Sequence, residues 1–182
     1  MCIRDRAIGE PSHFNQSHSI LAPVYFLMGV FAAIGTSLSL VTGIGVLRNT
    51  RTSLSLPLKY CVGYGLIITF ILTMITAGYM SGAPAQAHAV LPAGATTASG
   101  TLSVPLLGWL REVGDLRVAH FFATHALHGV PLTGWLLVRF LPQDQLSGNS
   151  AARTTALALS GGYCVLVVAL FIQALNGMAF IR

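Results

Sequence analysis

Residues 60–80 read YCVGYGLIITFILTMITAGYM, a run that contains no charged side chain. A helix that spans a bilayer needs about 20 consecutive, predominantly apolar residues, and this run meets that length. Working outward from it, charged or loop-like segments separate three more such runs, at residues 20–47, 115–140 and 154–180. We therefore expect an all-α fold, a transmembrane helical bundle with four spans in this chain.

The overall composition supports a membrane environment. Of the 182 residues, 54% are hydrophobic and 8% are charged, whereas soluble domains carry about 25% charged residues. The mean hydropathy is +0.72. The formal net charge of +5 does not indicate a nucleic-acid partner, because the basic residues lie between apolar runs and form no patch with interleaved aromatic residues. The expected partner is the lipid bilayer.

The basic residues also predict an orientation. One side of the predicted bundle carries five of them, Arg48, Arg51, Lys59, Arg139 and Arg153, and the other side carries three, Arg111, Arg117 and Arg182. Since cytoplasmic loops of membrane proteins are enriched in Lys and Arg, the first side is expected to be cytoplasmic. This predicts a multi-pass protein of the bacterial cytoplasmic (inner) membrane, with residues 7–19 and the loop 81–114 outside.

The first six residues, MCIRDR, match the translation of a transposase adapter used in sequencing libraries. We expect them to be adapter read-through and exclude them from the fold. The membrane domain then covers residues 20–182, and the natural chain is expected to begin further upstream. Helices upstream in the same chain would then be partners of this bundle. The sequence leaves open whether the protein forms an oligomer.

Two local patterns predict details of the helices. Gly35, Ser39 and Gly43 recur at four-residue spacing, which lets another helix approach closely. Near the end of the fourth span, Asn176 precedes Gly177, and a glycine just past a helix is a common C-terminal stop.

Polar side chains gather in residues 114–131, GDLRVAHFFATHALHGVP. At about 100° per residue, one stripe of the helix holds Arg117, His120, Thr124, His128 and Pro131, with His125 at its edge. Polar groups inside a membrane are costly, so such a stripe is by default a functional-site hypothesis. Pro131 removes one helix hydrogen bond, and we expect it to bend the helix beside His128.

Polar residues on the other spans are expected to lie in the same outer half of the membrane. These are Thr69, Thr73 and Thr76 on the second span and Gln173 and Asn176 on the fourth. The arrangement has three interpretations. One is a site for a polar or anionic ligand, or a proton relay, built on Arg117 with His125 or His128. Another is structural, with these groups capping helices and bonding loop carbonyls.

The third interpretation is a metal or haem b site, because neutral imidazoles are common axial ligands. Its candidate ligands are His120, His125, His13 and His88. A reducible Soret band would distinguish haem from the other two. We expect no catalytic residues, since the chain has no nucleophile elbow, P-loop, GxGxxG or HExxH pattern.

Five short patterns carry a resemblance to a known family. They are SHFN (12–15), PLLGW (105–109), GDLRVAHF (114–121), HAL (125–127) and QALNG (173–177). Together they resemble the C-terminal part of a family of uncharacterised bacterial multi-pass integral membrane proteins, over nearly the whole chain after Glu10. The resemblance implies further helices upstream and no activity. It favours His13, Arg117, His120 and His125 as site residues, because positions 88 and 128 depart from the family pattern.

From these observations we rank three possible functions of the protein. A membrane-embedded binding or structural protein comes first, with a polar site in the outer half of the membrane formed by Arg117, His120, Thr124, His125, His128 and His13. A b-type haem protein is the alternative. A transporter comes last, because transporters place broken helices near the midplane and only Pro131 points to one.

Overall fold

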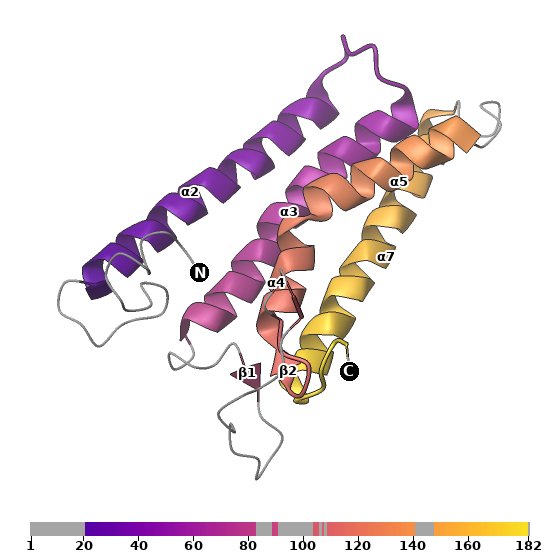
Figure 1. Ribbon diagram of the computed structural model, residues 1–182. Helices are drawn as coiled ribbons and strands as arrows, with labels where there is room; N and C mark the ends of the chain where they lie inside the picture. Colours follow the sequence, from indigo (N-terminus) through magenta and orange to yellow (C-terminus); the bar gives the residue numbers. More distant parts are fainter. Residues whose placement is uncertain are drawn as a thin grey trace.

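The computed structural model describes residues 21–82, 89–90, 104–105, 107, 109–140 and 148–181. In these residues it has the helices α2 (Leu21–Arg48), α3 (Leu56–Gly82), α4 (Leu116–Thr124), α5 (Ala126–Phe140) and α7 (Asn149–Leu175) (Figure 1). The two-residue strands β1 (Ala89–Val90) and β2 (Gly114–Asp115) pair antiparallel. The described part of the chain is an all-α bundle, as expected. The segments 1–6 and 7–19 lie outside it.

Three of these helices, α2, α3 and α7, are long and apolar enough to cross a membrane, and the pair α4 and α5 passes the same test as one bent span. Their positions follow the predicted runs, because uninterrupted apolar side chains favour a helix that satisfies its own backbone groups in lipid. The largest shift is in α7, which begins at Asn149 and ends at Leu175.

Helix α3 is the centre of the bundle. It contacts α2, α4, α5 and α7, whereas α2 lies at the outside and packs on α3 (Figure 1). A Cβ atom on Gly43 would lie 2.8 Å from the carbonyl oxygen of Gly63, so the two backbones touch there, as the small-residue spacing predicted. At Gly35 the same Cβ would meet nothing within 4 Å. The helices therefore separate towards the start of α2.

The third span is broken, and the predicted position of its bend was wrong. The axes of α4 and α5 differ by 56° at a break after Thr124, whereas Pro131 lies inside α5. In a continuous helix the Phe122 carbonyl would accept the Ala126 N–H. Here the Tyr163 hydroxyl of α7 donates to that carbonyl at 2.9 Å. A tertiary hydrogen bond thus replaces the helical one upstream of the proline.

The end of α7 confirms the predicted stop. Asn176 is the C-cap, and Gly177 follows with φ 71°, a conformation that glycine adopts without a Cβ penalty. The Gly177 N–H donates to the Ala174 carbonyl at 2.9 Å and the Met178 N–H to the Gln173 carbonyl at 3.2 Å. This pair of bonds is the Schellman motif.

Candidate functional site

A buried carboxylate organises the start of α4. Asp115 is 1% exposed and is the N-cap, where its Oδ1 accepts the Arg117 N–H at 3.0 Å. Its Oδ2 accepts the Leu110 N–H at 3.0 Å and a guanidinium N–H of Arg117 at 2.6 Å. Arg117, which the sequence marked as a candidate ligand-binding residue, therefore forms an ion pair with Asp115. The pair ties the preceding loop to the helix.

Gly114 lets this start dock against the end of α7. A Cβ atom there would collide with the Ala174 carbonyl oxygen and lie 2.8 Å from the carbonyl carbon. Both atoms are backbone, so neither can rotate away. The strand residues before α4 and the last turn of α7 thus form one close contact, and Met80, Leu116 and Ala174 fill a core cluster beside it.

His120 bonds across to α3. Its Nδ1 lies 2.9 Å from Thr76 Oγ1, and that hydroxyl also lies 2.9 Å from the Leu72 carbonyl. Since a hydroxyl has one proton and a carbonyl cannot donate, Thr76 donates to Leu72 and accepts from the His120 ring. The contact fixes the orientation of the ring and joins α4 to α3.

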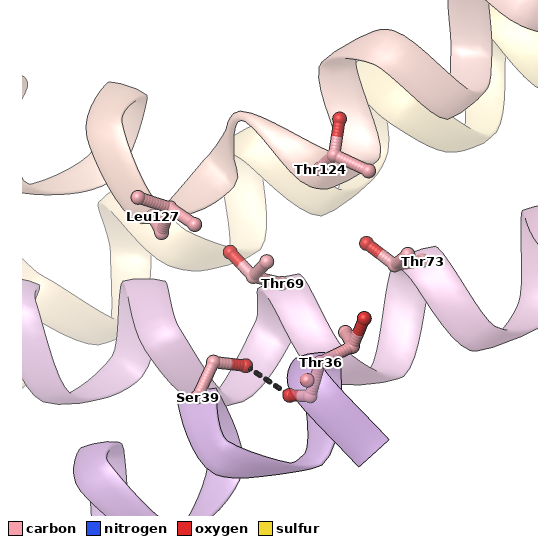
Figure 2. Close-up of a pocket in the computed structure, with 7 residues that line it drawn as sticks. Thr36, Ser39, Thr69, Thr73, Thr124 and Leu127 are labelled. Atoms are coloured by element: carbon pink, nitrogen blue, oxygen red, sulfur yellow. Dashed lines mark hydrogen bonds between the residues drawn. The ribbon is translucent and has the colours of Figure 1, made fainter. Parts of the chain in front are cut away.

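A pocket of about 240 Å³ lies where the third span breaks. It sits between α2, α3 and the junction of α4 with α5 (Figure 2). Its lining is rich in hydroxyl groups and consists of Gly35, Thr36, Ser39, Thr69, Thr73, Thr124 and Leu127. The separation of α2 from α3 at Gly35 and the break after Thr124 together leave this space.

Thr73 is the exceptional residue of the pocket. It is 7% exposed, yet its Oγ1 has no hydrogen-bond partner among the described residues. Figure 2 shows this oxygen directed from α3 into the space between Thr69 and Thr124. Buried hydroxyls are normally bonded. A buried, unpartnered hydroxyl that faces a cavity indicates a site for a water, an ion or a ligand.

His125 and His128 lie away from this pocket. Both are exposed, and their ring centroids are 5.7 Å apart. The His125 ring stacks on Phe121 at 4.0 Å, and its Nδ1 lies 2.7 Å from the Phe121 carbonyl oxygen. The single predicted stripe is therefore wrong at this point: His120 and Thr124 face α3, whereas His125 and His128 do not line the same space.

The predicted site is thus only partly assembled. Thr124 lines the pocket with Thr69 and Thr73, but Gln173 and Asn176 bond to the carbonyls of Ala179 and Ile172 near the end of α7. His13 and His88 lie outside the described residues. Within the described ranges, no three His, Cys, Asp or Glu side chains are grouped to hold a metal ion. The haem interpretation stays a prediction that involves those two undescribed histidines.

Sequence reasoning missed the contribution of α2. Gly35, Thr36 and Ser39 line the pocket, and the spacing of Gly35 and Ser39 was interpreted as packing alone. A useful signal was present: three hydroxyl residues, Thr36, Ser37 and Ser39, lie within four positions of a predominantly apolar run.

Comparison with known proteins adds no name to this site. No protein-family model, curated protein or solved structure matches the chain.

The hydrogen bond at the break gives a first prediction. Tyr163→Phe removes the donor to the Phe122 carbonyl, and we expect the unfolding free energy in detergent to fall by about 1–2 kcal/mol, since an unsatisfied polar group costs about that much. Tyr79→Phe is the control, because Tyr79 is exposed and packs on Phe171 through its ring. Equal losses in the two variants would show that the Tyr163 bond does not hold the break.

Proposed function

We propose that this chain is an integral membrane protein that binds a small polar ligand or ion in the pocket at the break of its third span. The observation that carries the proposal is the Thr73 hydroxyl, buried and without a partner among the described residues. An unsatisfied buried hydroxyl costs about 1–3 kcal/mol. A ligand that bonds to it recovers this cost, which makes binding at this position favourable.

The arrangement of charges supports the proposed location. Arg48 ends α2, Arg51 lies between α2 and α3, and Lys59 lies in the first turn of α3. This is the same end of the bundle as the end of α5 and the start of α7 (Figure 1). Arg139 and Arg153 belong to those two helix ends. We infer that this end is cytoplasmic by the positive-inside rule, in a bacterial inner membrane. The Asp115 end, with β1 and β2, would then be extracytoplasmic.

The broken span favours a transporter as the second candidate. Transporters commonly bind substrate where a membrane helix is interrupted, and here α4 and α5 meet at 56° beside the pocket. The sequence placed this function last because it predicted a proline bend only. Uptake by proteoliposomes of whichever solute binds would distinguish a carrier from a protein that binds without transport.

Filling the pocket tests the proposed binding. Gly35 lines the pocket and a Cβ atom there meets nothing within 4 Å, so we expect Gly35→Leu to be tolerated and to reduce the space. We expect at least one solute among sodium chloride, ammonium chloride, sodium acetate and glycerol to raise the melting temperature of the wild type and not of the variant. A ligand at 100 times its Kd stabilises by about 2.7 kcal/mol, which such a measurement detects.

The matched control is Gly78→Leu. Gly78 also has nothing within 4 Å of an added Cβ, but it lies on an exposed position of α3 outside the pocket. It should respond to solutes as the wild type does. If every solute shifts Gly35→Leu and the wild type equally, the pocket is not a binding site and the proposed function is wrong.

A further inference from the structure

The direction of the hydroxyl protons decides what the pocket can bind. Each Ser or Thr hydroxyl has one proton and two acceptor lone pairs. Four of the five hydroxyls in the lining lie within bonding distance of a carbonyl of their own helix, which must be the acceptor. The distances are Thr36 to Ala32 2.6 Å, Ser39 to Thr36 2.6 Å, Thr69 to Gly65 2.7 Å and Thr124 to Phe121 2.9 Å. Their protons are therefore in use.

The pocket consequently offers acceptors and almost no donors. Figure 2 shows the Thr69 and Thr73 oxygens pointing from α3 towards α4 and α5, and the Thr36 oxygen pointing from α2 towards Thr73. The Thr124 hydroxyl is turned back to its own helix. Three hydroxyl oxygens thus converge with free lone pairs, and Thr73 alone has an uncommitted proton. Anions, which need donors, are disfavoured here.

The charges around the pocket further restrict the class of ligand that it can bind. None of the described lining residues is ionised, and Asp115, at the opposite end of α4 from the pocket, is already paired with Arg117. The C-terminal end of α4 and the N-terminal end of α5 meet at the break, so the negative partial charge of the first end and the positive partial charge of the second offset each other there. Divalent cations in proteins rely on carboxylate ligands. A single positive charge, by contrast, loses less hydration energy on entering such a site.

We propose that the pocket binds a monovalent cation, through the hydroxyl oxygens of Thr36, Thr69 and Thr73. This inference rests on the proposed function and specifies its ligand. Two kinds of monovalent cation share this chemistry. An alkali ion is coordinated by the oxygen lone pairs, and a small primary ammonium ion donates its N–H groups to them. A volume of about 240 Å³ exceeds a bare ion, since one water takes about 30 Å³ in the liquid. The cation therefore keeps part of its water shell.

The test compares salts and variants in thermal unfolding of the purified protein. The chlorides of sodium, potassium, ammonium and methylammonium are compared at equal ionic strength with that of N-methyl-D-glucamine, a bulky organic cation that serves as the reference. We expect at least one of the four small cations to raise the wild-type melting temperature above the N-methyl-D-glucamine value. Sodium or potassium as the effective ion identifies an alkali site, and methylammonium identifies an ammonium site.

Two variants of Thr73 locate the effect. Thr73→Ser keeps the hydroxyl and should keep the shift, whereas Thr73→Val should need about tenfold more cation, as expected for the loss of one good hydrogen-bonding ligand. Thr73→Val should still fold, because it removes a buried unpartnered hydroxyl. Thr133→Val is the control: Thr133 is exposed on α5, outside the pocket lining, and bonds to the Val130 carbonyl.

The outcomes separate the two proposals. A cation shift that is present in the wild type and Thr73→Ser and weakened in Thr73→Val supports the cation site. A shift by glycerol or acetate alone, blocked by Gly35→Leu, overturns the cation inference and leaves the proposed function in place. A cation shift that Thr73→Val leaves unchanged also overturns it. No shift by any solute overturns both.

Discussion

Gly114→Ala is expected to destabilise the bundle by about 3–5 kcal/mol, a loss at the upper end for single substitutions. The added Cβ would collide with the Ala174 carbonyl oxygen and lie 2.8 Å from its carbon. Since these are backbone atoms in the last turn of α7, relief requires that the whole contact between β2 and α7 opens. That contact closes the end of the bundle where α4 begins.

The measurement is chemical or thermal unfolding of the protein in detergent micelles. Gly78→Ala is the control, because an added Cβ at this helical glycine meets nothing within 4 Å and alanine has the higher helix propensity. It should be neutral or slightly stabilising. If Gly114→Ala unfolds like Gly78→Ala, the close packing of β2 against α7 is not present in the protein.

Asp115→Asn is the second large effect that we expect, at about 3–5 kcal/mol. The side chain of Asp115 is fully buried, whereas that of Arg117 is 36% exposed. Hydrogen bonds to a charged group are worth about 1.5–3 kcal/mol each, and this substitution weakens those that the buried carboxylate accepts from the Leu110 N–H and the Arg117 side chain. Asparagine has a single acceptor oxygen, whereas the two oxygens of Asp115 accept the backbone N–H groups of Leu110 and Arg117 and the Arg117 guanidinium. The amide NH₂ group that replaces the second oxygen can accept none of these bonds.

Unfolding of Asp115→Asn is compared with that of Glu112→Gln, which removes a negative charge from an exposed position three residues earlier. The Glu112 variant should change the unfolding free energy by less than about 0.5 kcal/mol. High salt should leave the difference between the two variants nearly unchanged, because buried pairs are screened little. A small effect at Asp115 would mean that the carboxylate is hydrated.

The spans were predictable because each depends on local composition. The apolar runs around residues 20–47 and 60–80 became α2 and α3 with small changes at their ends. The stop after α7 was equally local, because Gly177 needs only a left-handed backbone conformation. Hydropathy and glycine chemistry act on neighbours in sequence, so the sequence contains this information directly.

The break in the third span was not predictable in the same way. Proline is the strongest local signal for a helix bend. The bend was therefore predicted at Pro131. The observed break is accompanied by a tertiary contact, because Tyr163, which is far away in the sequence, donates its hydroxyl proton to the Phe122 carbonyl. A helical wheel assumes one continuous helix, so it placed His128 with His120. After the break at Thr124, the two residues no longer share a phase.

The candidate site was likewise predictable where it depends on local sequence and not where it depends on tertiary contacts. Thr69 and Thr73 were recognised because they are polar residues at helical spacing in a membrane span, and the structure places both in the pocket. His120 and His125 were also predicted as site residues, yet His120 bonds to Thr76 and His125 stacks on Phe121. The pocket itself depends on where α2 leaves α3, and the phase of a single helix gives no account of that separation.

The most direct test of the cation site is a crystal structure of the full protein grown with a rubidium or thallium salt, with anomalous differences measured at the metal edge. If a monovalent cation binds in the pocket, an anomalous peak should lie within coordination distance of Thr36, Thr69 and Thr73 in the wild type and should be weaker or absent in Thr73→Val. An empty pocket in well-diffracting wild-type crystals, with the heavy cation bound only elsewhere, would contradict the cation site.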